Sequence, residues 1–281
     1  MTDFAAERIP SLGDTEPYRK TAFREENFVE LRDAAADSMH GAAERGVLCS
    51  PKISVQMQYP LLHMQHAEDR CYLRKEAAER LLGAARLLPD GIRFRIWDAW
   101  RPFALQQELF DVYTDRIVRV FHLEGKTPEE RRTFMSRFVA LPNADHVCPP
   151  VHTTGGALDV TLEKTDGTLL PMGTGFDSFS DATWGDWFER FCEGSVSMEE
   201  GLAAGTVLPG EFRREDAEKI RDSRRLLYHV MTSAGFTGIG SEWWHFDFGD
   251  RNWAFYTGGA AFYQGVFTAE DIRCIRRDED R

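Results

Sequence analysis

The order of hydrophobic and polar positions predicts helices and strands that follow one another without a repeating βαβ unit. In residues 73–88, LRKEAAERLLGAARLL, apolar side chains recur at helical spacing, and the following PDG ends the run. Residues 92–97, IRFRIW, alternate apolar and basic side chains as a half-buried strand does. Helical patterns return over 103–120 and over 214–236. This mixed order predicts an α+β fold with an antiparallel sheet.

The pattern is weaker in two parts of the chain. The first forty-odd residues are charged, and we expect residues 1–45 to form a surface arm with a short helix near Phe28–Ala36. Residues 183–212 mix Trp, Gly and acidic residues without a clear period, and we expect an insert over the functional site there. The rest of 46–281 is expected to form one domain.

Composition narrows the function classes. A chain of 281 residues with 42% hydrophobic and 12% aromatic content is typical of a globular protein. Its formal net charge of −12 disfavours nucleic acid and acidic membrane surfaces as partners. The N-terminus lacks a signal-peptide pattern and no apolar run reaches the ~20 residues of a membrane span, so a cytoplasmic location is expected. Five scattered cysteines predict reduced thiols, and homo-oligomerisation is left open.

A candidate pair of metal ligands lies in VHTTGGALDV, residues 151–160. If the chain turns as a two-residue hairpin at Gly155–Gly156, His152 falls opposite Asp159 on the same face of the sheet. Opposed Cβ atoms in antiparallel strands are about 4.5–5.5 Å apart, close enough for an imidazole and a carboxylate to share one ion. An ordinary hydrogen-bonded His–Asp pair is the alternative.

The segment EWWHFDFG, residues 242–249, supplies a candidate third ligand and a base. Catalytic zinc typically takes three protein ligands and keeps one position open, and His245 is the candidate for the third. Two imidazoles and one carboxylate suit Zn²⁺ better than Ca²⁺ or Mg²⁺, while non-haem iron stays open. Glu242 is expected to be the general base if the strand bulges or ends there. Trp243 and Trp244 are expected to wall the site.

Arg101, in DAWRP, stands at a predicted strand-to-helix corner that Pro102 fixes. Its permanent charge could stabilise an oxyanion or hold a substrate carboxylate. Asp98 is expected to support the turn, and a structural Arg101–Asp98 ion pair is the alternative. The remaining histidines have no matched carboxylate spacing and are expected to be surface or core residues: His40, His63, His66, His122, His146 and His229.

Four motifs, DAWRP, HTTGGALDVTL, MGTGFD and EWWH, together resemble those of the zinc D-alanyl-D-alanine dipeptidases of the VanX type. The resemblance spans about Leu73–Phe248. It implies a hedgehog/D,D-peptidase-like single domain, with a central antiparallel sheet flanked by helices and extra helical inserts. It also implies Zn²⁺ as cofactor and a small D,D-dipeptide such as D-Ala-D-Ala as substrate. The implied roles are zinc ligands His152, Asp159 and His245, catalytic base Glu242, transition-state cation Arg101 and amino-group acceptor Asp177.

Departures from the family pattern bear on the substrate. The family commonly has a serine two residues before the first histidine, whereas this chain has Pro150, which donates no hydrogen bond. Two other functions stay open, a D,D- or L,D-carboxypeptidase acting on cell-wall peptidoglycan and a non-catalytic zinc-binding domain like that of the hedgehog relatives. The presence of both Glu242 and Arg101 favours an enzyme, because a purely structural metal needs neither.

Overall fold

The computed structural model describes residues 3–13, 15, 18–33, 46–135, 139–197 and 214–278. Its strands are β1 (Phe28–Asp33), β2 (Val47–Ser50), β3 (Ile53–Val55), β4 (Cys71–Arg74), β5 (Ile92–Asp98), β6 (Ala157–Lys164), β7 (Thr237–Gly238) and β8 (His245–Asp247). Its α-helices are α2 (Gln58–Leu61), α3 (Lys75–Ala85), α4 (Phe103–Val120), α5 (Pro128–Met135), α6 (Trp187–Glu193), α8 (Arg214–Ser233), α9 (Arg251–Thr257) and α10 (Ala269–Asp278). Two 3-10 turns are η1 (Val151–Thr154) and η2 (Asp181–Thr183).

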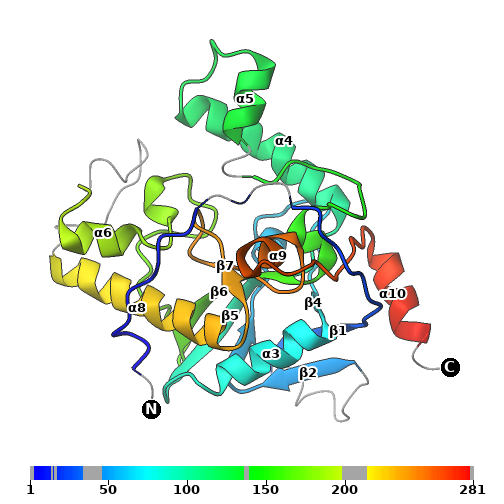
Figure 1. Ribbon diagram of the computed structural model, residues 1–281, viewed down its shortest axis with the longest axis horizontal. Helices are drawn as coiled ribbons and strands as arrows, with labels where there is room; N and C mark the ends of the chain where they lie inside the picture. The colour runs from blue at the N-terminus through cyan, green and yellow to red at the C-terminus, as the bar shows by residue number, and fades with distance from the viewer. Residues whose placement is uncertain are drawn as a thin grey trace.

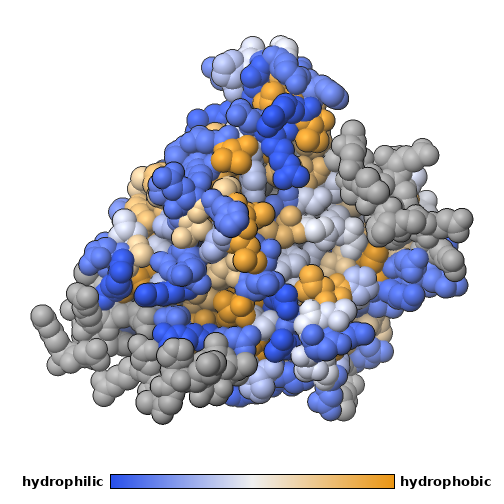
Figure 2. Space-filling view, turned by 180° about the vertical axis from the view of Figure 1, so that it is seen from behind, coloured by the Kyte–Doolittle hydropathy of each residue, from blue (hydrophilic) through white to orange (hydrophobic). Residues whose placement is uncertain are grey.

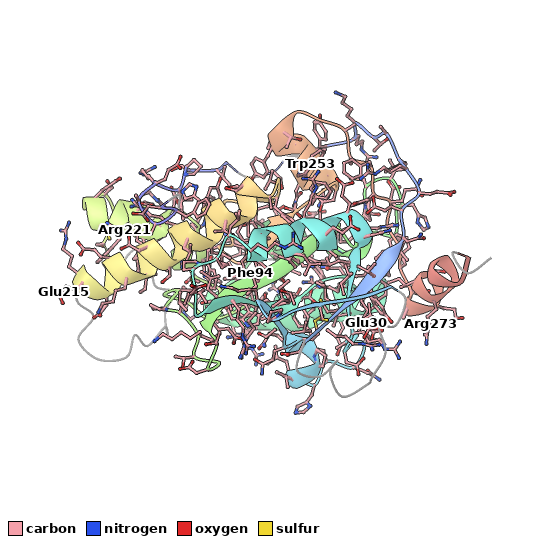
Figure 3. The ribbon with its side chains drawn as sticks, turned by 90° about the horizontal axis from the view of Figure 1, so that it is seen from below. Glu30, Phe94, Glu215, Arg221, Trp253 and Arg273 are labelled. Carbon is pink, nitrogen blue, oxygen red and sulfur yellow. The ribbon has the colours of Figure 1, made fainter. Side chains whose placement is uncertain are left out.

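A five-stranded sheet has the order β3-β5-β6-β8-β7. Figure 1 shows its strands β5, β6 and β7 near the centre of the molecule. Every neighbouring pair is antiparallel except β3 and β5. Helices α3 and α8 lie side by side against one face of this sheet (Figures 1 and 3). Alternate residues of β5 and β6 point toward these helices and are fully buried, namely Phe94, Ile96, Leu158, Val160 and Leu162. Burial of this apolar face is the main favourable contribution to the fold.

The opposite face of the same sheet is polar although it is also buried. Asp159, Thr161 and Glu163 of β6 are at most 2% exposed. Glu163 forms ion pairs with Arg93 and Arg95 of the neighbouring strand β5. Because a buried carboxylate is costly unless it is paired, these arginines make its position tolerable. The buried polar face of β6 therefore carries two carboxylates, Glu163 and Asp159, with Thr161 between them.

A β-bulge decides which way Asp98 points. Up to Ile96 the register is regular, with Ile96 opposite Val160, but the next pair is Asp98 with Asp159 and leaves Trp97 as the extra residue. Without this shift, strict alternation would place Asp98 on the face that carries Phe94 and Ile96. The bulge turns its carboxylate to the polar face instead.

The N-terminal residues differ from the expected arm with a short helix. Residues 28–33 form strand β1, the middle strand of a second sheet of order β2-β1-β4, so the helix predicted near Phe28–Ala36 is wrong for its described part. Pairing with β2 and β4 stabilises an extended backbone in a segment whose Phe28 and Leu31 are buried, which overrides local helical preference. The division into an arm, 1–45, and a domain, 46–281, stays a prediction.

The other expected elements agree closely with the structure. The α+β class and the antiparallel character of the central sheet are confirmed, and α4 has the predicted bounds. The helix predicted over 73–88 begins only at Lys75, because residues 71–74 pair with β1 as strand β4. Of the expected insert 183–212, residues 183–197 contain α6, and the remainder lies outside the described residues.

The surface adds one negative finding. Hydrophobic side chains on the face in Figure 2 occur in separate groups between hydrophilic ones. No helix in the described part of the chain combines the length and the apolar character needed to cross a bilayer.

A glycine pair connects η1 to β6, and we predict that its second member tolerates no side chain. A Cβ at Gly156 would lie 2.2 Å from the backbone oxygen of Phe248, so Gly156→Ala should lower the free energy of unfolding by about 1–3 kcal/mol. Gly83 in α3 has no atom within 4 Å of a built Cβ, and Gly83→Ala should instead raise it by about 0.5–1 kcal/mol. Urea denaturation of both variants measures the difference; equal effects would contradict the assignment.

Candidate metal centre and active site

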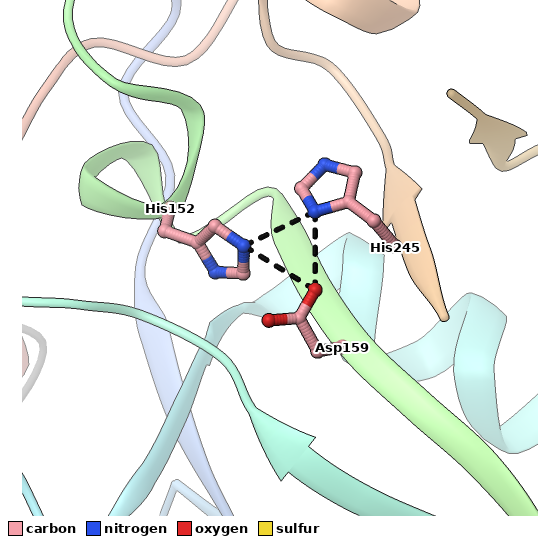
Figure 4. Close-up of side chains that lie close together, drawn as sticks. All are labelled: His152, Asp159 and His245. Carbon is pink, nitrogen blue, oxygen red and sulfur yellow. Dashed lines mark hydrogen bonds and ion pairs between the residues drawn. The ribbon is translucent and has the colours of Figure 1, made fainter. Parts of the chain in front are cut away.

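Three side chains converge at the end of the central sheet (Figure 4). Asp159 on β6 is the cross-strand partner of His245 on β8, and His152 reaches them from η1. The distance between His245 Nδ1 and Asp159 Oδ1 is 3.1 Å, and His152 Nε2 lies 3.2 Å from His245 Nδ1 and 3.5 Å from Asp159 Oδ1. All three residues are buried.

His152 reaches this place by a different route from the one predicted. The two-residue hairpin at Gly155–Gly156 is wrong, because residues 151–154 form a 3-10 turn. The hydroxyls of Thr153 and Thr154 donate to Pro150 O and Val151 O, and Gly155 ends the turn with a φ of 75°. Side-chain hydrogen bonds of this kind compete with strand pairing. His245, and not His152, occupies the position directly opposite Asp159.

The far nitrogens of the two imidazoles are held by acceptors. His152 Nδ1 donates to Ala99 O at 2.8 Å, and His245 Nε2 donates to Asp247 Oδ1 at 2.8 Å. A neutral imidazole carries one proton, so His152 Nε2 and His245 Nδ1 present lone pairs to each other and to Asp159. Such outer acceptors orient the histidine ligands of metal sites.

The donor set fits a zinc ion. With both imidazoles neutral, three acceptor atoms face one another, an arrangement that a cation stabilises. Against the lowering effect of burial, Asp247 and Asp159 raise the pKa of His245 well above its usual value, so the site attracts positive charge. Zinc bonds of about 2.0–2.2 Å at tetrahedral angles place ligand atoms roughly 3.3–3.6 Å apart, close to the observed separations. Burial alone would raise the pKa of Asp159, but attraction to the imidazoles of His152 and His245 in their charged forms holds it far below its usual value. The carboxylate is therefore ionised, as a ligand must be.

Glu242 lies beside this triad in a turn that precedes β8. Its Oε2 is 3.9 Å from His245 Nδ1, and β8 begins only at His245, which meets the condition that the strand ends between them. Burial raises the pKa of Glu242 to about 8, with His245 acting in the opposite direction. Trp243 and Trp244 do not line the cavity as expected. Both indoles pack in the main hydrophobic core instead.

Arg101 is held tightly at the corner between β5 and α4. Its guanidinium donates to Asp98 Oδ2 at 3.0 Å, to Gln106 Oε1 at 2.8 Å and to the Tyr59 hydroxyl at 3.2 Å. Asp159 Oδ2 lies 3.7 Å away. The expected support from Asp98 is thus present, and it coexists with the exposure of Arg101 to the cavity.

Asp177 occupies a strained backbone position with a φ of 52°, unusual for a residue with a side chain. The hydroxyls of Tyr59 and Tyr113 donate to its Oδ2 at 2.9 and 2.6 Å. Burial raises the pKa of Asp177 to about 6, against the lowering effect of Tyr113. These contacts aim one carboxylate into the cavity from the side of α2 and α4.

One cavity of about 370 Å³ joins these groups. It is lined by all six residues singled out from the sequence: Arg101, His152, Asp159, Asp177, Glu242 and His245. Sequence analysis missed the partners Tyr59, Tyr113 and Asp247. Asp247 carried a signal, because residues two apart in a strand share a face. Nothing in the spacing of the two tyrosines marked them.

The protein combines an α+β fold with a buried set of three potential metal ligands, His152, Asp159 and His245, beside an open cavity. These features define the class of candidate metallopeptidases. A family model described as D-ala-D-ala dipeptidase matches residues 62–185 and 214–261, so the chain belongs to this family. The resemblance inferred from the four motifs is thereby confirmed.

Two curated relatives carry the name D-alanyl-D-alanine dipeptidase. The Synechocystis protein is 34% identical over 165 residues, which cover 57% of this chain and 60% of the relative. The Escherichia coli protein is 27% identical over 183 residues, 65% of this chain and 69% of the relative. The match thus spans less than two thirds of the Synechocystis protein.

Two solved structures also match this chain. They are the vancomycin resistance D,D-pentapeptidase VanY in complex with Zn(II) and VanYB in complex with D-Alanine-D-Alanine. Each is 15% identical to this chain and covers 70% of it, with 85% and 84% of the respective neighbour included and TM-scores of 0.35 and 0.36.

We predict that Asp247→Asn lowers zinc affinity about 10–100-fold, because it weakens the acceptor that orients His245. Titration of the purified protein against a competing chelator measures the affinity. Asp90→Asn, which removes the same charge at a fully exposed side chain, is the control and should leave it unchanged. Equal affinities in all three proteins would exclude Asp247 from the site's support.

We also predict that Glu242 destabilises the metal-free protein. A carboxyl group whose pKa rises from 4.5 to about 8 on folding costs stability that grows as the pH rises above 4.5 and is complete above 8. Glu242→Gln should therefore stabilise the chelated protein on the order of 4 kcal/mol at pH 8 and hardly at all at pH 4.5. Denaturant titrations at both pH values provide the measurement, and a difference independent of pH would refute the raised pKa.

Proposed function

We propose that the chain is a zinc-dependent dipeptidase that hydrolyses D-Ala-D-Ala or a related D,D-dipeptide. The observation that carries the proposal is the place of Glu242, a carboxylate 3.9 Å from one member of a convergent His–Asp–His triad and in the same cavity. Family membership and the names of the curated relatives support the substrate class.

In this proposal His152, Asp159 and His245 hold the zinc ion. Bound there, zinc would supply Lewis acidity, which polarises a peptide carbonyl and lowers the pKa of water. The described residues offer three ligand atoms of this kind within 4.8 Å of one another, fewer than the four that close a structural zinc site. The triad therefore favours a catalytic over a purely structural metal.

Glu242 would act as the general base and then as the general acid. Its carboxylate takes a proton from the attacking water and passes it to the amine that leaves. A group with a pKa near neutrality performs both transfers well, and burial brings Glu242 into that range, to about 8 in the metal-free protein. A cation nearby lowers this value, so the ionised form predominates at neutral pH when the site is loaded.

Arg101 and Asp177 would contact two different groups of the substrate, the carbonyl oxygen of the scissile bond and the free ammonium group. Arg101 is buried and permanently charged, so it can stabilise negative charge that develops on the carbonyl oxygen. Asp177 can accept the substrate ammonium group, which compensates the cost of its own burial. Asp177 would hold an ammonium group one residue before the scissile bond. A substrate with further residues before that position has no ammonium group there, so the site favours a dipeptide over a longer chain.

The decisive test compares the zinc-loaded wild type with Glu242→Ala. We expect kcat for D-Ala-D-Ala to fall about 10²–10⁴-fold while zinc content stays the same, because the variant loses proton transfer and keeps the ligands. Glu129→Ala, on the exposed side of α5, serves as the control. A loaded wild type that cleaves no dipeptide would favour a binding domain, and cleavage of longer peptides only would favour a D,D- or L,D-carboxypeptidase.

The cytoplasmic location stays a prediction.

A further inference from the structure

Arg251, the first residue of α9, lines the same cavity as Asp159, Asp177 and Glu242. Within the residues that the structure describes, its guanidinium takes part in no ion pair, and its buried Nε has no hydrogen-bond partner. A buried donor without a partner costs free energy that a ligand can recover. This arginine therefore differs from a surface cation held by neighbouring carboxylates.

The second arginine of the cavity provides the contrast. Arg101 donates to Asp98, Gln106 and Tyr59 and lies near Asp159 as well, so carboxylates already balance its charge. Its remaining N–H groups are the ones that the proposed function assigns to the carbonyl oxygen. Among the described residues that line the cavity, Arg251 is the permanent cation whose charge no carboxylate balances. A negatively charged ligand group finds its strongest site there.

The backbone beneath Arg251 is fixed to the support of the metal centre. Asp250 accepts hydrogen bonds from the backbone amides of Asn252 and Trp253 and so caps α9. The side chain of Asn252 donates to Asp247 Oδ2 at 3.2 Å, and Asp247 in turn holds His245. Figure 3 shows Trp253 on α9 above the helices that cover the sheet. The base of the arginine is thus held relative to the reacting atoms.

We propose that Arg251 binds the C-terminal carboxylate of the dipeptide, an inference that rests on the proposed function. A free dipeptide carries one ammonium and one carboxylate. Of the three carboxylates that line the cavity, Asp177 is neither a proposed metal ligand nor the proposed base, and it is assigned to the ammonium. Pro150, two residues before His152, has neither a hydroxyl nor an amide proton for the substrate carboxylate. The guanidinium fork of Arg251 supplies two donors in the geometry that a carboxylate accepts. Arg251 then selects substrates that end in a free acid.

The test uses D-Ala-D-Ala and its C-terminal amide, D-alanyl-D-alaninamide, as a matched pair of substrates. Arg251→Gln should raise KM for the acid about 10–100-fold with a small change in kcat, and should lower the acid-to-amide ratio of kcat/KM by the same factor. Arg251→Lys should recover part of this loss, because it restores charge without the fork. Arg119→Gln, at an exposed residue of α4, is the control for charge and should behave as the wild type. Equal losses for acid and amide would show a structural role and overturn the proposal.

A binding measurement separates this inference from the proposed function. The zinc-loaded Glu242→Gln protein, with and without Arg251→Gln, is titrated with D-Ala-D-Ala and with the amide by calorimetry. If the dissociation constant for the acid is about 10–100-fold larger in the double variant, the carboxylate contact is supported even if the wild type hydrolyses neither compound. Unchanged affinity for the acid overturns the contact even if the wild type is an active dipeptidase.

Discussion

The functional site depends on the pairing of β6 with β8, which brings Asp159 opposite His245 in the interior of the protein. One carboxylate oxygen and two ring nitrogens, each able to offer a lone pair to a cation, are packed within 3.5 Å of one another. Such a grouping is unfavourable in isolation and persists because the surrounding structure holds it. The Ala99 carbonyl orients one ring, Asp247 orients the other, and Arg101 restrains the carboxylate. The same restraints that make the group costly make it ready for a cation.

The central sheet divides two tasks between its faces. One face meets α3 and α8 through apolar side chains, and the other carries Asp98, Asp159 and Glu163 in buried ionic contacts. A single bulge at Trp97 moves Asp98 from the first set to the second. Residues two positions apart in a strand share a face, so substitutions on the apolar face change the packing of the core while those on the polar face change the site.

The sequence predicted the site residues better than the path of the backbone between them. The helix over 103–120 was found because its apolar period is long and regular, and the motif residues gather in one cavity as expected. The turn at His152 was missed because TTGG is compatible with a hairpin and with a 3-10 turn, and only the threonine contacts decide between them. Strand β1 was missed because its partners begin at residues 47 and 71, outside any local window. The bulge has no signal in IRFRIW at all.

The long sequence separation within the triad has a consequence for biosynthesis. His152 and Asp159 are made 93 and 86 residues before His245, so a nascent chain holds two donors without the third. A protein ligand pair binds metal far more weakly and less selectively than the completed set. The complete ligand set exists only after β8 has been made and has paired with β6, and tight metal binding then stabilises the folded chain. Selection of the ion is thereby deferred to the finished protein.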